Sequence, residues 1–263
     1  MVDLQLAKST VKLHREFVQR FLRWLDDKPL TREALRQFLS QFNGKSTSTY
    51  ANALKALKVF FRDFLGMPEL VESFRFPKQT FKPKNIPSGE QLRRFYEALA
   101  TPRDKALFLF YASTGLRRRE ALELTLDDVD FEKRMVKPKP HNGKTKRVWV
   151  TFFNEECASM LKAYLAKRVG KAKKSEKLFP MSKACERTLW HKARAETGIR
   201  ITPQTLREWF CSEMARLGVN DSYIDAFCGR VPRSVLARHY LDYSPERLRE
   251  VYEKAGLRVL EEA

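Results

Sequence analysis

The feature that most constrains the fold is a stretch without apolar periodicity in the first half of the chain. Residues 75–91, RFPKQTFKPKNIPSGEQ, contain three prolines and several lysines. Proline fixes φ and lacks a backbone donor, so this stretch interrupts helices and sheets alike. It is typical of an extended basic linker. The sequence therefore predicts two domains, at residues 1–76 and 88–263, joined by residues 77–87.

The segment before the linker has the pattern of a small helical domain. Apolar residues recur at steps of four within residues 9–26, which is one face of an amphipathic helix. Two further runs follow, one after Pro29 and one that ends at Gly66. Three or four short helices are expected here.

The segment after the linker is also mainly helical. Ser88 and Gln91 form a capping-box pattern, and Thr101-Pro102 places proline at a first helical position. A helix carrying Glu120 follows the Gly115 turn. Further helices are expected over residues 154–168, 182–197, 203–217, 221–228 and 245–255.

One β signal interrupts these helices, at residues 134–152. Val148, Val150 and Phe152 alternate with Arg147, Trp149 and Thr151, and Asn142-Gly143 is a strong hairpin turn signal. The predicted fold class is mainly α with a small β-hairpin sheet, in two domains.

Charge narrows the class of partner. The chain has 51 Lys and Arg against 32 Asp and Glu, a formal net charge of +19. Such a surplus of positive charge favours a polyanionic binding partner. Nucleic acid is the first candidate, and an anionic membrane surface is the second. No apolar run approaches the roughly 20 residues of a membrane span, and the N-terminus lacks a signal-peptide core. An intracellular (cytoplasmic) protein without a membrane partner is expected.

Cysteines and histidines do not indicate a metal site. The four cysteines show no C-x-x-C spacing, and the four histidines are scattered. Buried free thiols are expected, and neither a metal nor a cofactor. Asn and Gln are scarce beside Lys, Arg and Glu, which leans toward a thermophilic source.

Three short segments carry the residues suited to phosphate chemistry. STGLRRREALELTLDDV (113–129) presents three arginines after a tight turn, QTLREWF contains Arg207, and CGR contains Arg230. A planar guanidinium binds phosphate oxygens through two parallel hydrogen bonds. Taken singly, each segment also fits a basic helix start or a structural ion pair.

Together these segments resemble the tyrosine recombinase (phage integrase) family, in a divergent branch such as that of archaeal viruses or plasmids. The resemblance implies that Arg117 and Arg207 are the two catalytic arginines and that Glu120 is the acid of the first box. Gln204 replaces a histidine of the family, and Arg230 stands where the family has His or Trp. The likeness covers the whole chain, with residues 1 to about 80 similar in size to a DNA core-binding domain, but only residues 88–263 carry motifs.

The resemblance also implies a tyrosine nucleophile. Tyr240 lies 33 residues after Arg207 and 10 after Arg230, and a helix start follows it at Ser244-Pro245. Tyr243 better fits a half-buried aromatic under the last helix. We therefore assign the nucleophile to Tyr240.

The implied activity is site-specific cleavage and rejoining of double-stranded DNA through a 3′-phosphotyrosyl intermediate. Lys144 and Lys146 are both candidates for the acid that protonates the leaving oxygen. The resemblance further implies a protein largely monomeric in solution that forms a homo-tetramer on DNA, docking its last helix (residues 245–255) on a neighbour. Alternatives are a type IB topoisomerase or resolvase activity, a DNA-binding protein inactivated at Gln204, and a general basic nucleic-acid coating protein.

Overall fold

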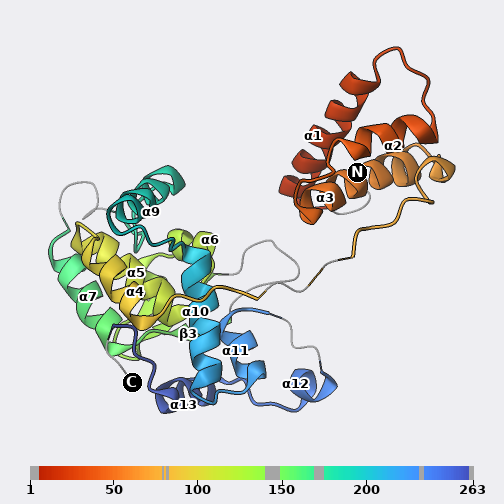
Figure 1. The fold of residues 1–263 in the computed structure, drawn as a ribbon. Coiled ribbons are helices and arrows are strands. Elements are labelled where there is room, and N and C mark those ends of the chain that lie inside the picture. Colours follow the sequence, from red (N-terminus) through yellow and green to blue (C-terminus); the bar gives the residue numbers. More distant parts are fainter. Residues whose placement is uncertain are drawn as a thin grey trace. The chain divides into compact units, whose positions relative to one another are not determined.

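The computed structural model describes residues 6–78, 80, 83–139, 149–168, 175–230 and 234–260. The chain divides into two compact units, Met1–Pro83 and Lys84–Ala263 (Figure 1). Each unit has its own hydrophobic core. The predicted sites lie in the second unit.

The first unit is a helical bundle around an aromatic core. It contains α1 (Lys8–Leu25), α2 (Arg32–Ser40), α3 (Thr47–Lys58), a π-helical turn η1 (Val59–Phe64) and a 3₁₀ turn η2 (Pro68–Leu70). Phe21 lies at its centre and makes edge-to-face contacts with Phe38 and Phe61, at centroid distances of 5.1 and 5.6 Å. The predicted helical character of this segment is confirmed.

The second unit contains most of the helices and the sheet. Its helices are α4 (Gly89–Glu97), α5 (Pro102–Thr114), α6 (Arg118–Glu123), α7 (Glu155–Ala166), α9 (Lys183–Thr197), α10 (Pro203–Arg216), α11 (Asp221–Phe227), α12 (Val235–His239) and α13 (Pro245–Ala255), with a 3₁₀ turn η3 (Leu126–Asp128). The predicted start signals are confirmed, because each cap side chain accepts a hydrogen bond from the third helical residue. These caps are Ser88, Thr101, Thr202 and Ser244.

The sheet has three short antiparallel strands, one more than the predicted hairpin. Strand β2 (Met135–Val136) pairs with both β1 (Val129–Asp130) and β3 (Thr151–Phe152). The alternating pattern indicated β3, whereas a two-residue strand such as β1 is too short to show a period. The predicted Asn142-Gly143 turn lies outside the described residues.

Helix α5 is the buried axis of the second unit. Every residue from Ala106 to Thr114 is buried, and the helix packs against both α7 and α10 (Figure 1). A helix that is apolar all round belongs in a core. Its C-terminal end therefore delivers the next residues to a fixed place beside α10.

The last helix, α13, packs its apolar stripe on its own unit's core, contrary to the expectation that little of this unit would be left to bury it. Its docking on a neighbour stays a prediction. Leu248 and Tyr252 are buried against this core, and the Tyr252 hydroxyl donates to the Ser113 carbonyl at 2.9 Å. The expectation about burial was wrong because proximity to the C-terminus says little about which surface covers a helix.

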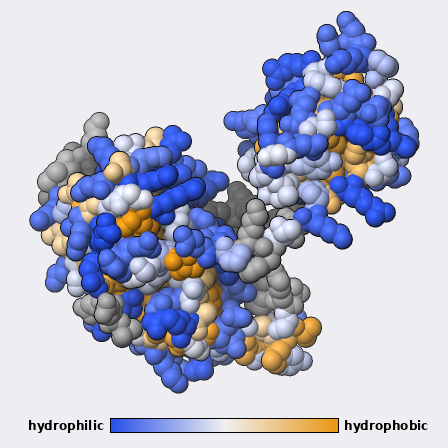
Figure 2. Space-filling view, viewed as in Figure 1, coloured by the Kyte–Doolittle hydropathy of each residue, from blue (hydrophilic) through white to orange (hydrophobic). Residues whose placement is uncertain are grey.

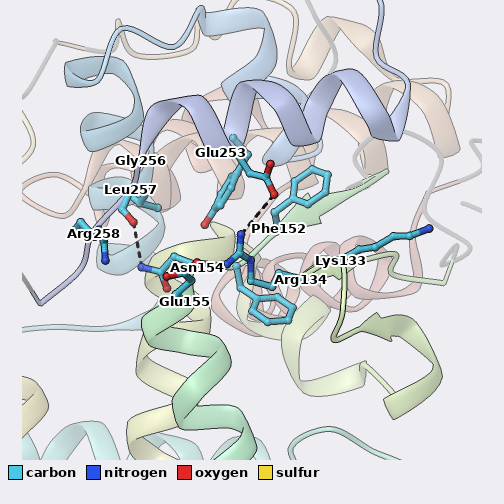
Figure 3. A pocket seen from close by; sticks show the side chains of 11 residues that line it. Lys133, Arg134, Phe152, Asn154, Glu155, Glu253, Gly256, Leu257 and Arg258 are labelled. Atoms are coloured by element: carbon cyan, nitrogen blue, oxygen red, sulfur yellow. Dashed lines mark hydrogen bonds and ion pairs between the residues drawn. The ribbon is translucent and has the colours of Figure 1, made fainter.

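A cavity of about 350 Å³ lies where α13 meets the sheet (Figure 3). Arg134 donates across it to Glu253 at 3.4 Å and to Glu155 at 2.7 Å, and Asn154 donates to the Leu257 carbonyl at 3.2 Å. These contacts fasten the C-terminal end of α13 to the rest of the unit.

Candidate active site

Arg117 is positioned by the turn that ends α5. Gly115 adopts a left-handed conformation with φ of 63°, and its amide donates to the Tyr111 carbonyl at 3.1 Å. Arg117 is the N-cap residue of α6. The Glu120 carboxylate accepts from the Arg117 backbone amide at 2.7 Å and from its Nη1 at 2.8 Å. Glu120 thus fixes both the backbone and the guanidinium of Arg117, whose side chain stays 30% exposed.

Only glycine fits at the turn between α5 and Arg117. A Cβ on Gly115 would lie 2.5 Å from Cδ1 of Phe210, and its positive φ is itself unfavourable for other residues. Phe210 belongs to α10, one turn after Arg207. The missing side chain therefore lets the Gly115 backbone approach α10 closely, which brings its carbonyl within reach of Arg207.

Arg207 joins three elements in the interior. Its Nη1 donates to the Gly115 carbonyl at 2.5 Å and its Nη2 to the Cys228 carbonyl at 2.7 Å, and only 4% of the residue is exposed. Burial lowers the pKa of Arg207, and the nearby charge of Arg117 lowers it further. Because arginine keeps its proton in proteins, the result is concentrated positive charge that favours an anionic ligand.

Arg230 follows the C-terminal end of α11. Its Nη1 donates to Asp225 at 3.1 Å, and its Nη2 lies 3.4 Å from the Cys211 sulfur. The Cys211 sulfur in turn lies 3.4 Å from that of Cys228, the residue whose carbonyl binds Arg207. The structure therefore brings Arg117, Arg207 and Arg230 into one arginine group.

Gln204 is exposed one turn before Arg207 on α10. Its Nε2 donates to Glu208 at 3.0 Å, and Glu208 also accepts from Lys84 at 2.5 Å. Burial alone would raise the pKa of Glu208, but the hydrogen bonds from Lys84 and Gln204 bring it below the ordinary value. Among the hydrogen bonds of the described residues, that of the Gln204 side chain goes to Glu208 and none goes to the arginines.

The two tyrosines differ sharply in environment. Tyr240 follows α12 and is 75% exposed. Tyr243 packs edge-to-face on Tyr223 at 5.9 Å, and burial raises its pKa. Within the described residues, no hydrogen bond joins the Tyr240 hydroxyl to the arginine group. Lys144 and Lys146 lie outside the described residues.

Two residues of this neighbourhood were missed as site residues. Cys211 and Cys228 were expected only as buried thiols, yet one contacts Arg230 and the other holds Arg207 through its carbonyl. They are 17 residues apart and form no spacing motif. The only signal in the sequence was the direct proximity of Cys228 to Arg230 in CGR.

Solved structures share the fold of this chain. An integrase of the Tn1549 transposon, in complex with circular intermediate DNA, matches with a TM-score of 0.68 and 20% identity over 93% of each chain. A lambda integrase dimer bound to a core site matches with a TM-score of 0.66 and 16% identity, over 90% of this chain and 92% of that one. These likenesses confirm the predicted fold class.

Sequence relatives define the family. The tyrosine recombinase XerA of Thermococcus onnurineus is 30% identical over 95% of this chain and 90% of its own length, and that of Pyrococcus furiosus is 28% identical over 95% and 89%. The phage integrase family model matches residues 88–247, and the model of its N-terminal SAM-like domain matches residues 3–69. This chain belongs to the phage integrase family. The predicted activity class, a tyrosine-type site-specific DNA recombinase, is confirmed at this level.

None of the described helices combines the length and apolar character that crossing a membrane requires.

Proposed function

We propose that this recombinase cleaves and rejoins double-stranded DNA with Tyr240 as nucleophile and the arginine group as its phosphate site. The observation that carries the proposal is the arginine group: Arg117 follows the Gly115 turn, Arg207 donates to the Gly115 carbonyl, and Arg230 contacts the thiol pair beside Arg207. Residues 1–76 are proposed as the DNA core-binding domain, residues 77–87 as linker and residues 88–263 as catalytic domain. The protein would act inside the cell, on DNA.

The chemistry follows from the charge and the remaining donors of this group. Arg207 uses one N–H of each terminal nitrogen on backbone carbonyls, which leaves its other N–H groups for a phosphate. Preorganised cations stabilise the pentavalent transition state, and their field favours the phenolate of an approaching tyrosine. Tyr240 attacks the scissile phosphate, a 5′ oxygen leaves, and the bond energy is kept as a 3′-phosphotyrosyl ester. The exposure of Tyr240 leaves its hydroxyl accessible to DNA.

A denaturing gel with a labelled, nicked cognate duplex tests this function. A covalent protein–DNA product is expected for the recombinase. Salt-dependent binding with no such product would indicate an inactive DNA-binding protein or a general coating protein instead. A product that is religated without exchange between duplexes would indicate the topoisomerase alternative.

The leaving-group acid is proposed to be Lys144 or Lys146. A lysine near the leaving oxygen can supply its proton. A substrate with a bridging 5′-sulfur leaves without a proton, so it should restore cleavage to whichever of Lys144→Ala and Lys146→Ala lacks the true acid. If the sulfur substrate rescues neither variant, the acid lies elsewhere, for example at His141.

The assembly is proposed to be a monomer in solution and a tetramer around two DNA duplexes. The net charge of +19 opposes self-association until phosphates neutralise it. Figure 2 shows a mainly hydrophilic surface with an apolar patch at α12, where Val235 and Leu236 are 70% and 64% exposed.

Light scattering tests this assembly. It should give the mass of a monomer for the protein alone and the mass of four protomers when cognate DNA is present. A stable tetramer without DNA would contradict the charge argument.

A further inference from the structure

Two thiols lie together beside the arginine group. Cys211 is on α10, Cys228 ends α11, and their sulfur atoms are 3.4 Å apart. Cys228 is buried and its sulfur also faces the Gly115 carbonyl at 3.9 Å, while Cys211 is only partly buried. One thiol of the pair can therefore be reached from solvent, and the other is held immediately behind it.

The charges around the pair activate one thiol. A hydrogen bond from Cys228 lowers the pKa of Cys211, and the positive charges of Arg230 and Arg207 lower it further. Burial alone would raise it. The pKa of Cys228 is raised by its hydrogen bond with Cys211 and by burial. These shifts favour a thiolate at Cys211 and a neutral thiol at Cys228, the arrangement of an attacking and a resolving cysteine. By contrast, burial raises the pKa of Cys157 and leaves that thiol unreactive.

We propose that Cys211 and Cys228 are a redox site that closes reversibly to a disulfide and thereby controls the arginine group. The oxidant is a peroxide. The Cys211 thiolate attacks hydrogen peroxide, which cleaves the O–O bond and gives a sulfenic acid and hydroxide. The hydroxide takes up the proton that the Cys211 thiol released and leaves as one water. The Cys228 sulfur then displaces the sulfenic oxygen as a second water. The two thiols lose two electrons and hydrogen peroxide gains them.

The effect on the arginines follows from the contacts that must change. A disulfide requires a sulfur separation of about 2.05 Å, so the two sulfurs must approach by more than an ångström. The move withdraws the Cys211 sulfur from Arg230 and removes the negative charge of the Cys211 thiolate. It also pulls on Cys228, whose carbonyl accepts a hydrogen bond from Arg207. Oxidation should therefore weaken DNA cleavage. This consequence depends on the proposed function, whereas disulfide formation does not.

The first measurement is chemical and uses the unmodified full chain. The protein is treated with dilute hydrogen peroxide, digested without reductant and examined by mass spectrometry. A peptide linked through Cys211 and Cys228 is expected, and a thiol reductant should remove it. Oxidation confined to the exposed Cys185, or to sulfinic and sulfonic acids without a linked peptide, would overturn the proposal.

The second measurement is the ratio of cleavage rates for reduced and oxidised samples of each protein. The wild type and Cys185→Ala should both lose about tenfold on oxidation, less than the ~10²–10³-fold lost with a whole transition-state donor. Cys211→Ala should show a ratio near one. A linked peptide with unchanged cleavage would overturn the control of the arginines. A linked peptide in a protein that never cleaves DNA would overturn the proposed function and leave the redox site standing.

Discussion

Tyr240→Phe is expected to abolish the covalent protein–DNA adduct and to leave DNA affinity nearly unchanged. Phenylalanine keeps the ring but lacks the oxygen that would form the ester. Because the hydroxyl is exposed and the chain carries a net charge of +19, one hydroxyl is a small part of the binding free energy. The adduct is measured on a denaturing gel and the affinity by titration at a fixed salt concentration.

Tyr243→Phe is the matched control for that experiment. Tyr243 lies three residues after Tyr240 and packs on Tyr223. The substitution therefore removes the same hydroxyl group, but from a packed side chain. It should keep most of the cleavage activity. An adduct that survives Tyr240→Phe and disappears with Tyr243→Phe would show that the assigned nucleophile is wrong by one turn.

Arg207→Ala is expected to slow cleavage by about 10²-fold or more, as does the loss of other transition-state donors. The truncation also leaves the carbonyls of Gly115 and Cys228 without their partner, and a buried carbonyl left unpaired costs about 1–3 kcal/mol. Cleavage must therefore be measured together with the free energy of unfolding. The rate is compared at a temperature where the variant is fully folded.

Arg207→Lys separates catalysis from structure. A lysine keeps the charge and can bind one carbonyl, but it has no planar fork for two carbonyls and a phosphate. We expect poor rescue of cleavage with partial rescue of stability. Arg117→Ala supplies a second comparison, because the Arg117 backbone amide still binds Glu120 when the side chain is removed. Cleavage at the wild-type rate in Arg207→Lys would argue that Arg207 is only structural.

The sequence predicted the helices well where local chemistry decides them. The caps at Ser88, Thr101, Thr202 and Ser244 each bind backbone amides as expected. Local rules work here because a cap acts within one turn of the helix. Helix α12 was not predicted, since five residues carry too little periodicity to be recognised.

The arginine group shows the limit of sequence reasoning. Its members were identified by their resemblance to motifs, but the contacts among them depend on three distant segments. The Gly115 carbonyl binds a side chain 92 residues away, and that approach depends on the absence of a Cβ against Phe210. The thiol pair beside it also arises from the packing of α10 on α11, which no local pattern encodes.

Tyr240 is the residue that we expect to become joined to DNA. The most direct measurement traps the covalent complex on a nicked cognate duplex, digests the protein and identifies the nucleotide-bearing peptide by mass spectrometry. We expect one modified residue, Tyr240, linked to the 3′ phosphate of a single position in the duplex. A nucleotide found on Tyr243 or on any other side chain, or distributed over many positions of the DNA, would contradict it.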